Sequence, residues 1–421
     1  MTNSRFKLMQ VNSIICELVG LLCFFNCLTY VNCFGWTNWN HNLLQSVSDC
    51  PTFDGNRTGI CVSSAAECRN RGGRRLGSCY SNQGGINNQN YQYGGQSSYG
   101  PLFGGPGLGI AVGVCCSIQV SCGETIRFNG TYFRNPGAPA PFSDSRACSV
   151  TVARSQPNIC QLRLDFLKFD LDRPRTGVCE NDRFVVSGQA ANSIIPAICG
   201  YNTGQHMYLD LDPSNLGPIT LNVITIGNRP RLFDIRVTYI SCASPHRAPA
   251  NCLQYQNNLI GQIKSFNFEE FQVGAGTGYL SGLDYAICFK KPPGYCSVTY
   301  TVPRQLFADI GQSIIHQTTQ PQTNYQVNPG QYFNIIGMVG NDQAGAGHYD
   351  CPQDYLQLAN IPLCGSRLNS QLIPPTPNPT TNAEVVDNST GPIVARFVSN
   401  FNEVGRGFLL DYRFNPCMVA G

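Results

Sequence analysis

The chain has few charged residues, few histidines and no long apolar segment after its N-terminal region. Charged residues make up 13% of the 421 residues, against a usual share of about 25%. The net charge of +3 is too small to indicate a nucleic acid or a membrane surface as the partner. Neither H-E-x-x-H nor G-x-S-x-G nor GDSGG occurs. Without these zinc-protease and serine-hydrolase motifs, we expect the protein not to be an enzyme.

Cysteine is the residue type that the chain has in excess. There are 22 cysteines, and none of them forms a C-x-x-C pair. Zinc sites usually need such pairs or closely spaced histidines, and only five histidines are present. A disulfide framework is the better interpretation, and disulfides indicate an oxidising, extracellular compartment.

The N-terminus also indicates secretion. Arg5 and Lys7 precede the apolar stretch SIICELVGLLCFFNCLTY, which predicts a signal peptide over residues 1–33, followed by a spacer over 34–49. An uncleaved membrane anchor is the alternative. After cleavage we expect an extracellular mature chain with eighteen cysteines and no membrane span. Its predicted N-glycosylation sites are Asn56, Asn129 and Asn388.

The eighteen cysteines fall into three groups of six, and the second and third groups form an internal repeat. In both groups a Cys-x-x-Asp motif precedes a strand-like run, and a Cys-Gly pair follows it. The groups are Cys50, Cys61, Cys68, Cys79, Cys115 and Cys116; Cys122, Cys148, Cys160, Cys179, Cys199 and Cys242; and Cys252, Cys288, Cys296, Cys351, Cys364 and Cys417.

Short alternating runs between Gly- and Pro-rich turns predict an all-β fold of sandwich type. Residues 243–251, ASPHRAPAN, read as a linker between the two repeats. In the first group, residues 83–113 are rich in Gly, Asn, Gln and Tyr, which predicts a mobile insertion.

The second group resembles the CUB domain. The similarity rests on the 26-residue spacing from Cys122 to Cys148, the run RLDFLKFDL, Cys-x-x-Asp and the following Cys-Gly. The third group is similar to a divergent CUB domain, and the first group resembles a clip-type disulfide module through GICVSSAAEC and GVCC. This order of modules is similar to arthropod secreted CUB proteins. The resemblance implies two CUB-type β-sandwiches, 117–242 and 252–417, preceded by a clip-like module over 50–116.

The resemblance also implies a pairing of the cysteines, which spacing alone could not choose from the fifteen possibilities within each group. The CUB pattern implies the first two bridges of the second group and leaves one pair, and the repeat gives the third group. The implied bridges are Cys50–Cys115, Cys61–Cys79, Cys68–Cys116, Cys122–Cys148, Cys179–Cys199, Cys160–Cys242, Cys252–Cys288, Cys351–Cys364 and Cys296–Cys417.

Many CUB domains bind Ca²⁺ through an early Glu, the Cys-x-x-Asp carboxylate and a late-loop Asp. Asp182 has the middle role in the first repeat, but its late loop TIGNRPR carries Arg229 and Arg231, which would repel a dication. In the second repeat, Asp354 has this role, and the late loop offers Asn400, Asn402 and Glu403. The favoured interpretation at both sites is a carboxylate that caps backbone N–H groups, so that no cofactor is expected; calcium is the alternative.

A basic cluster lies beside the first cysteine group. The run CRNRGGRR contains Arg69, Arg71, Arg74 and Arg75. Arginine is suited to sulfate and carboxylate groups, so these residues are candidates for docking to a polyanion; the alternative is a solvated loop.

The sequence therefore predicts a secreted, non-catalytic binding or adhesion protein that acts on an extracellular protein or glycan. Two alternatives remain open. The clip-like module is compatible with a regulator of a clip-type serine protease cascade, and the Gly/Tyr-rich insertion is compatible with a component of the extracellular matrix or cuticle.

Overall fold

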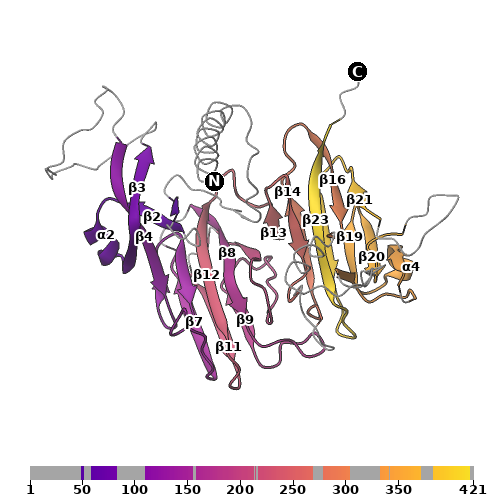
Figure 1. Cartoon of the computed structure of the whole chain (residues 1–421), viewed down its shortest axis with the longest axis horizontal. Helices are drawn as coiled ribbons and strands as arrows, with labels where there is room; N and C mark the ends of the chain where they lie inside the picture. Colours follow the sequence, from indigo (N-terminus) through magenta and orange to yellow (C-terminus); the bar gives the residue numbers. More distant parts are fainter. Residues whose placement is uncertain are drawn as a thin grey trace, which may run out of the picture. The chain divides into compact units, whose positions relative to one another are not determined.

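In a computed structural model, the regular elements of the residues described below are almost all β-strands, as predicted (Figure 1). It describes residues 49–51, 58–82, 110–154, 158–212, 214, 217–268, 278–303, 332–340, 342–370 and 383–417. All of them belong to one unit, Leu44–Gly421. The expected signal peptide, the expected spacer up to residue 48, and most of the Gly/Tyr-rich insertion lie outside the described residues; Asp49, the last residue of the expected spacer, begins a strand.

The N-terminal part of the described chain is a small antiparallel sheet with one short helix. The helix is α2 (Ala65–Asn70), and Ser64 is its N-cap: Ser64 Oγ accepts from Glu67 N at 3.1 Å. Two disulfides connect strands, and the third, Cys68–Cys116, connects the helix to β4. The strands are β1 (Asp49–Pro51), β2 (Thr58–Val62), β3 (Gly73–Asn82) and β4 (Ile110–Val120).

Strand β4 joins this small sheet to the next part of the chain. It pairs antiparallel with β2 and β3, and its last residues pair parallel with β6 (Thr131–Arg134). The boundary that sequence analysis expected after residue 116 therefore lies within a continuous strand. Residues 110–113, expected to end the mobile insertion, form the start of β4.

Two sheets form the first sandwich. One has the order β1-β2-β4-β6-β12-β8-β10, with β3 also on β4, and the other has the order β5-β7-β11-β9. Alternate residues of β11 are buried, from Ile219 to Thr225, which is the period-2 pattern of a half-buried strand. The remaining strands are β5 (Thr125–Ile126), β7 (Arg146–Val152), β8 (Ile159–Asp170), β9 (Arg183–Ser187), β10 (His206–Asp210), β11 (Ile219–Thr225) and β12 (Leu232–Ser241).

The second sandwich consists of two further sheets, with the orders β13-β15-β22-β19-β20-β18 and β14-β23-β16-β21, and β17 on β23. Its elements are β13 (Cys252–Gln256), β14 (Ile260–Lys264), β15 (Asp284–Phe289), β16 (Tyr295–Thr301), β17 (Phe333–Asn334), β18 (Ala344–Ala346), α4 (Gly347–Asp350), β19 (Tyr355–Leu358), β20 (Ile361–Gly365), β21 (Val385–Asp387), β22 (Ile393–Val398) and β23 (Gly407–Pro416).

Within the described part of the chain there are nine disulfides, three in each cysteine group. Their Cα–Cα distances are 4.7–5.8 Å, within the range that a disulfide requires. The pairs are those implied by the resemblance and the repeat. The longest loops are closed by Cys160–Cys242 and Cys296–Cys417, with sequence separations of 82 and 121 residues.

Buried polar side chains connect the two sandwiches. His206 Nε2 accepts from the backbone N of Tyr255 at 3.1 Å, and both residues are buried. This contact satisfies an N–H on β13, which is an edge strand of its sheet. Further bonds run from Gln254 Nε2 to Gln205 Oε1, from Asn267 N to Asn202 Oδ1, and from Gln161 Nε2 to the Ala248 carbonyl. We call these residues the junction layer.

Candidate functional site: the two Cys-x-x-Asp corners

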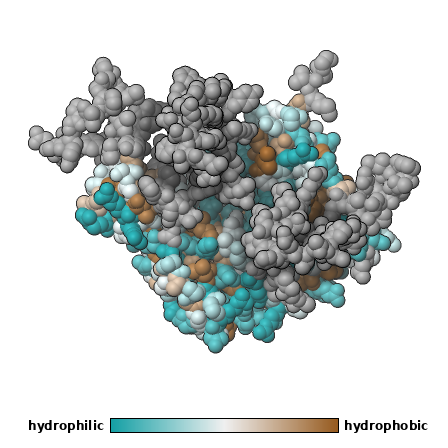
Figure 2. Space-filling view, viewed as in Figure 1, coloured by the Kyte–Doolittle hydropathy of each residue, from teal (hydrophilic) through white to brown (hydrophobic). Residues whose placement is uncertain are grey.

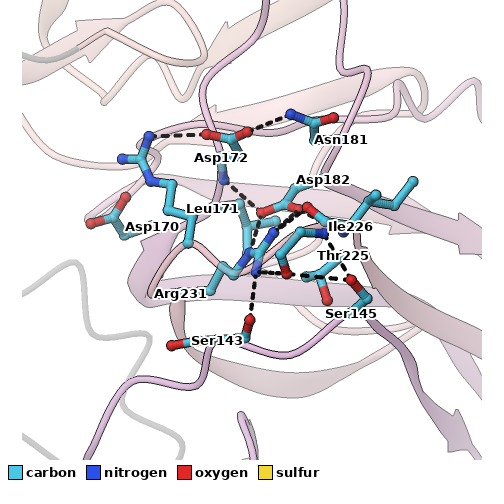
Figure 3. A network of polar contacts seen from close by, with 12 residues as sticks. Ser143, Ser145, Asp170, Leu171, Asp172, Asn181, Asp182, Thr225, Ile226 and Arg231 are labelled. Carbon is cyan, nitrogen blue, oxygen red and sulfur yellow. Dashed lines mark hydrogen bonds and ion pairs between the residues drawn. The ribbon is translucent and has the colours of Figure 1, made fainter.

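The first corner lies between the Cys179–Cys199 disulfide and β9. Asp182 immediately precedes β9 and is 1% exposed. Figure 3 shows its carboxylate at the centre of a polar network. The guanidinium of Arg231 donates from Nε to Oδ2 and from Nη2 to Oδ1, each at 2.8 Å. Backbone N–H groups of Asp172 and Ile226 donate to the same two oxygens, at 2.8 and 3.2 Å. Both oxygens of Asp182 therefore accept bonds from a fixed cation and from the backbone.

The Arg231 side chain is fully buried, and its guanidinium also donates to backbone carbonyl oxygens of the late loop and of residue 143. It donates to the carbonyl oxygens of Ile226 at 2.6 Å, Gly227 at 2.9 Å and Ser143 at 3.3 Å. A buried charge pair is tolerated when its geometry is good and its other polar atoms are satisfied, and this pair meets both conditions. The guanidinium of Arg231 is thus bonded to the carboxylate of Asp182, the residue that the CUB resemblance implies as a calcium ligand.

A second carboxylate extends this network at the surface. Asp172 accepts from Asn181 Nδ2 at 2.8 Å and from Arg229 Nη1 at 3.0 Å. Burial acts to raise the pKa of Asp172, but these hydrogen bonds and the positive charge of Arg229 outweigh it, and the pKa is lowered. Both late-loop arginines therefore bind a carboxylate of this corner.

The second corner has the same motif and different partners. Asp354 is 2% exposed; its Oδ2 accepts from the Tyr279 hydroxyl at 2.5 Å, and its Oδ1 accepts from the backbone N of Asn400 at 2.7 Å. Both donors are neutral. Burial raises the pKa of Asp354, although the two hydrogen bonds act in the opposite direction. Burial and the bond to Asp354 also raise the pKa of Tyr279.

The other calcium candidates do not complete a ligand set here. Asn400 Oδ1 accepts from the backbone N of Asn402 at 2.7 Å, which shapes the late loop, and Glu403 is exposed. Among the residues that the structure describes, no three His, Cys, Asp or Glu side chains are grouped so that they could hold a metal ion. Both Asp182 and Asp354 accept backbone N–H groups, which is the geometry of a loop-fixing corner.

Backbone conformation and close packing explain the glycine of the Cys-Gly pair in each repeat. Gly200 has φ +74°, and a Cβ there would lie 1.9 Å from Asn267 Oδ1 in the junction layer. Gly365 has φ +90°, and a Cβ there would lie 2.3 Å from the carbonyl oxygen of Gln343. Glycine fits both positions because it has no Cβ and adopts positive φ without steric cost.

The arginines of the basic cluster lie in different surroundings in the structure. Arg71 forms an ion pair with Glu67 at 2.5 Å and lies 5.1 Å from the ring centroid of Phe128. Arg74 and Arg75 are exposed neighbours on β3, so their side chains leave opposite faces of the strand. Arg69, at the end of α2, is also exposed. The four arginines therefore do not form a single uniform patch.

The two described sequons differ in exposure. Asn388 is exposed in the turn after β21. Asn129 is half-buried, and its Oδ1 accepts from the backbone N of Tyr239 at 2.7 Å. Asn56 lies outside the described residues.

Sequence reasoning missed two important partners. The sequence analysis treats Arg231 only as a residue that repels calcium. A basic residue in the late loop is also a signal for an ion-pair partner of Asp182. No pattern in the sequence marked Tyr279, which is 75 residues from Asp354 and meets it only through the fold.

Comparisons with known proteins concern the C-terminal part of the chain most directly. Residues 249–415 match the family model of the animal CUB domain. No curated protein matches the chain. Among the residues described, no helix is long and apolar enough to cross a membrane.

Several solved structures are similar to the chain at low sequence identity. The CUB1-EGF-CUB2 domains of rat MASP-1 are 13% identical, with a TM-score of 0.23 and coverage of 70% of this chain and 99% of that one. The corresponding human MASP-1/3 domains are 13% identical, with a TM-score of 0.22 and coverage of 68% and 100%. The extracellular region of zebrafish Gpr126/Adgrg6 is 12% identical, with a TM-score of 0.23 and coverage of 72% and 38%. The family match places a CUB domain at residues 249–415, which overlaps nearly all of 252–417, the region that sequence analysis described as the more divergent of two.

Proposed function

We propose that the protein is secreted and acts as a non-catalytic adhesion protein, binding an extracellular protein through CUB-type domains over residues 117–242 and 252–417. CUB domains are generally binding modules, and one is found at residues 249–415. The nine disulfides fit an extracellular location, where such bonds persist.

One observation supports binding through the loops of the second sandwich. Met338, Tyr349 and Phe401 are large apolar side chains, and they are 74%, 91% and 81% exposed. The backbone N of Met338 donates to the carbonyl oxygen of Asp350 at 2.7 Å, so the loop of Met338 adjoins α4, which carries Tyr349. Exposed aromatic and apolar side chains of this size are typical of protein-binding surfaces.

The Asp354 corner holds the neighbouring loops in place. Its carboxylate connects the late loop, through the backbone N of Asn400, to the Tyr279 hydroxyl. That hydroxyl also accepts from the backbone N of Ile336 at 3.2 Å, two residues before Met338. A fixed binding surface loses less conformational entropy when a partner binds.

The test is affinity capture from the extracellular fluid of the source tissue, with the full chain immobilised. The wild-type chain is compared with Tyr349→Ser combined with Met338→Ser, and with Val386→Ser as a control at a 46% exposed apolar position. We expect a partner that binds the wild type and the control and is lost from the double variant. Equal capture by all three chains would contradict binding through these loops.

The alternative functions depend on the N-terminal part. A protease-cascade regulator would act through residues 50–116, and binding to a purified clip-type protease would favour it. The matrix or cuticle role rests on the Gly/Tyr-rich insertion, most of which lies outside the described residues. Retention in an insoluble matrix fraction would favour that role.

A further inference from the structure

A cleft of about 260 Å³ lies beside the junction layer. The loop 192–195 and strand β10 line it on the side of the first sandwich, and β13, β15 and β22 line it on the other side. This volume is smaller than that of a typical small-molecule pocket and suits one or two side chains. Hydrophilic and hydrophobic residues are mixed on the face of the chain that Figure 2 shows. The lining residues of the cleft are likewise of both kinds.

Asp210 is a carboxylate of this lining that neutral donors hold in place. Its Oδ1 accepts from Gln161 Nε2 at 2.7 Å, and its Oδ2 accepts from the backbone N of Asn251 at 3.0 Å. Its own backbone N donates to Ser193 Oγ at 3.2 Å. A carboxylate has about four acceptor positions, so two neutral donors leave Asp210 able to accept further bonds.

The other charges of the lining form a pair. Arg396 donates from Nε to Asp284 Oδ1 at 2.7 Å and from Nη2 to Oδ2 at 2.6 Å. This two-point contact satisfies the geometry of both groups. Because the pair is neutral as a whole, the negative charge of Asp210 gives the lining its net charge.

An apolar surface lies next to this charge. Ile194, on the loop at the cleft, is 80% exposed, and Leu253 and Ala286 also contribute to the lining. An exposed aliphatic side chain beside a carboxylate complements a side chain with an aliphatic stem and a cationic end. Lysine and arginine have this construction.

We propose that the cleft receives a lysine or arginine side chain of the extracellular partner protein. The aliphatic stem would lie against Ile194, and the cationic end would donate to Asp210. This inference rests on the proposed binding function and specifies one contact of the partner, away from the Met338–Tyr349 loops.

The test uses Nα-acetyl-lysine N-methylamide and Nα-acetyl-arginine N-methylamide as probes, with saturation-transfer NMR titration of the full chain. The corresponding norleucine compound has an aliphatic stem and no charge. We expect at least one cationic probe to bind about tenfold more tightly than norleucine, a difference of about 1.4 kcal/mol. The same affinity for all three probes, or no binding, would overturn the proposal.

Two variants assign the binding to the cleft. Asp210→Asn removes the negative charge, and Ile194→Lys places a cation at an exposed position where folding does not depend on the side chain. We expect each to weaken the cationic probe about tenfold or more, whereas the control Asp212→Asn, at an exposed residue outside the lining, leaves binding unchanged. Unchanged binding to Ile194→Lys would reject the cleft even if Asp210→Asn fails to fold.

Two further results separate this inference from the proposed function. If methyl glycosides bind the chain and Asp210→Asn abolishes this binding, the ligand of the cleft is a glycan and the proposal of a basic side chain is wrong. A partner captured equally by wild type and Ile194→Lys would reject the role of the cleft while the binding function stands.

Discussion

Arg231 and Asp182 form a buried, two-point ion pair in which Nε and Nη2 each lie 2.8 Å from a different carboxylate oxygen. The equivalent carboxylate of the other repeat, Asp354, instead accepts a hydrogen bond from the Tyr279 hydroxyl. The same Cys-x-x-Asp motif is thus stabilised by a cation in one sandwich and by neutral donors in the other. This difference leads to the first two predictions.

Substitution of Arg231 should strongly destabilise the protein. Arg231→Ala leaves the charge of Asp182 buried without its cation, and removal of one partner of such a pair typically costs about 3–5 kcal/mol. Denaturant unfolding followed by circular dichroism measures this change in the free energy of unfolding. The control is Arg229→Ala, because the Arg229 side chain is 41% exposed in its pair with Asp172. Equal losses for the two variants would show that burial of the Arg231 pair is unimportant.

Calcium should change the stability little. A ligand that binds only the folded state, at a hundredfold excess over its Kd, adds about 2.7 kcal/mol to the free energy of unfolding. We expect no increase of that size when millimolar Ca²⁺ is added to chelator-treated protein. A rise that Asp354→Ala abolishes and Asp182→Ala leaves intact would instead identify a working calcium site in the second sandwich.

The sequence was sufficient to predict what depends on local pattern. Alternation in runs such as ITLNVIT indicated half-buried strands, and the repeated Cys-x-x-Asp and Cys-Gly motifs indicated two related units. The continuity of β4 was not predictable, because a run of cysteines at 115–116 looked like the end of a module. The junction layer was not predictable either, since polar residues such as Gln254 and Asn267 find their partners only after distant strands come together.

The junction layer should weaken in mild acid because of His206. Burial, and then the positive charge of Arg163, lower the pKa of His206 to about 3, from an ordinary value of 6.5. Between these values the unfolded chain binds a proton that the folded chain does not. The free energy of unfolding should therefore fall as pH falls below 6.5, by up to about 1.4 kcal/mol per pH unit from this group.

His206→Gln provides the measurement, because it removes the titrating ring. Urea unfolding at pH 7 and pH 5 should show a smaller loss of stability in this variant than in the wild type. His246→Gln, at an exposed position, is the matched control and should keep the wild-type dependence. A wild-type pH dependence in His206→Gln would remove His206 from the explanation.

Glycosylation should distinguish the two described sequons. We expect a glycan at Asn388, which is exposed, and little or none at Asn129, whose amide oxygen is engaged by Tyr239. Glycopeptide mass spectrometry of the chain expressed through a secretory pathway measures occupancy at each site. Full occupancy at Asn129 would mean that the glycan is attached before this contact forms and that the folded chain accommodates it.

The Cys160–Cys242 bridge should be needed for secretion. It joins the start of β8 to the residue after β12, with Cα atoms 4.8 Å apart, and it closes a loop with a sequence separation of 82 residues. A loop of this length corresponds to a stabilisation of about 4–5 kcal/mol in the chain-entropy model. Cys160→Ser should leave Cys242 as a free thiol and reduce the secreted yield, whereas Ala243→Ser, an exposed change directly after Cys242, should not. Peptide mapping of the unreduced wild-type protein checks the assignment directly: a fragment that links Cys160 to any cysteine other than Cys242 would reject it.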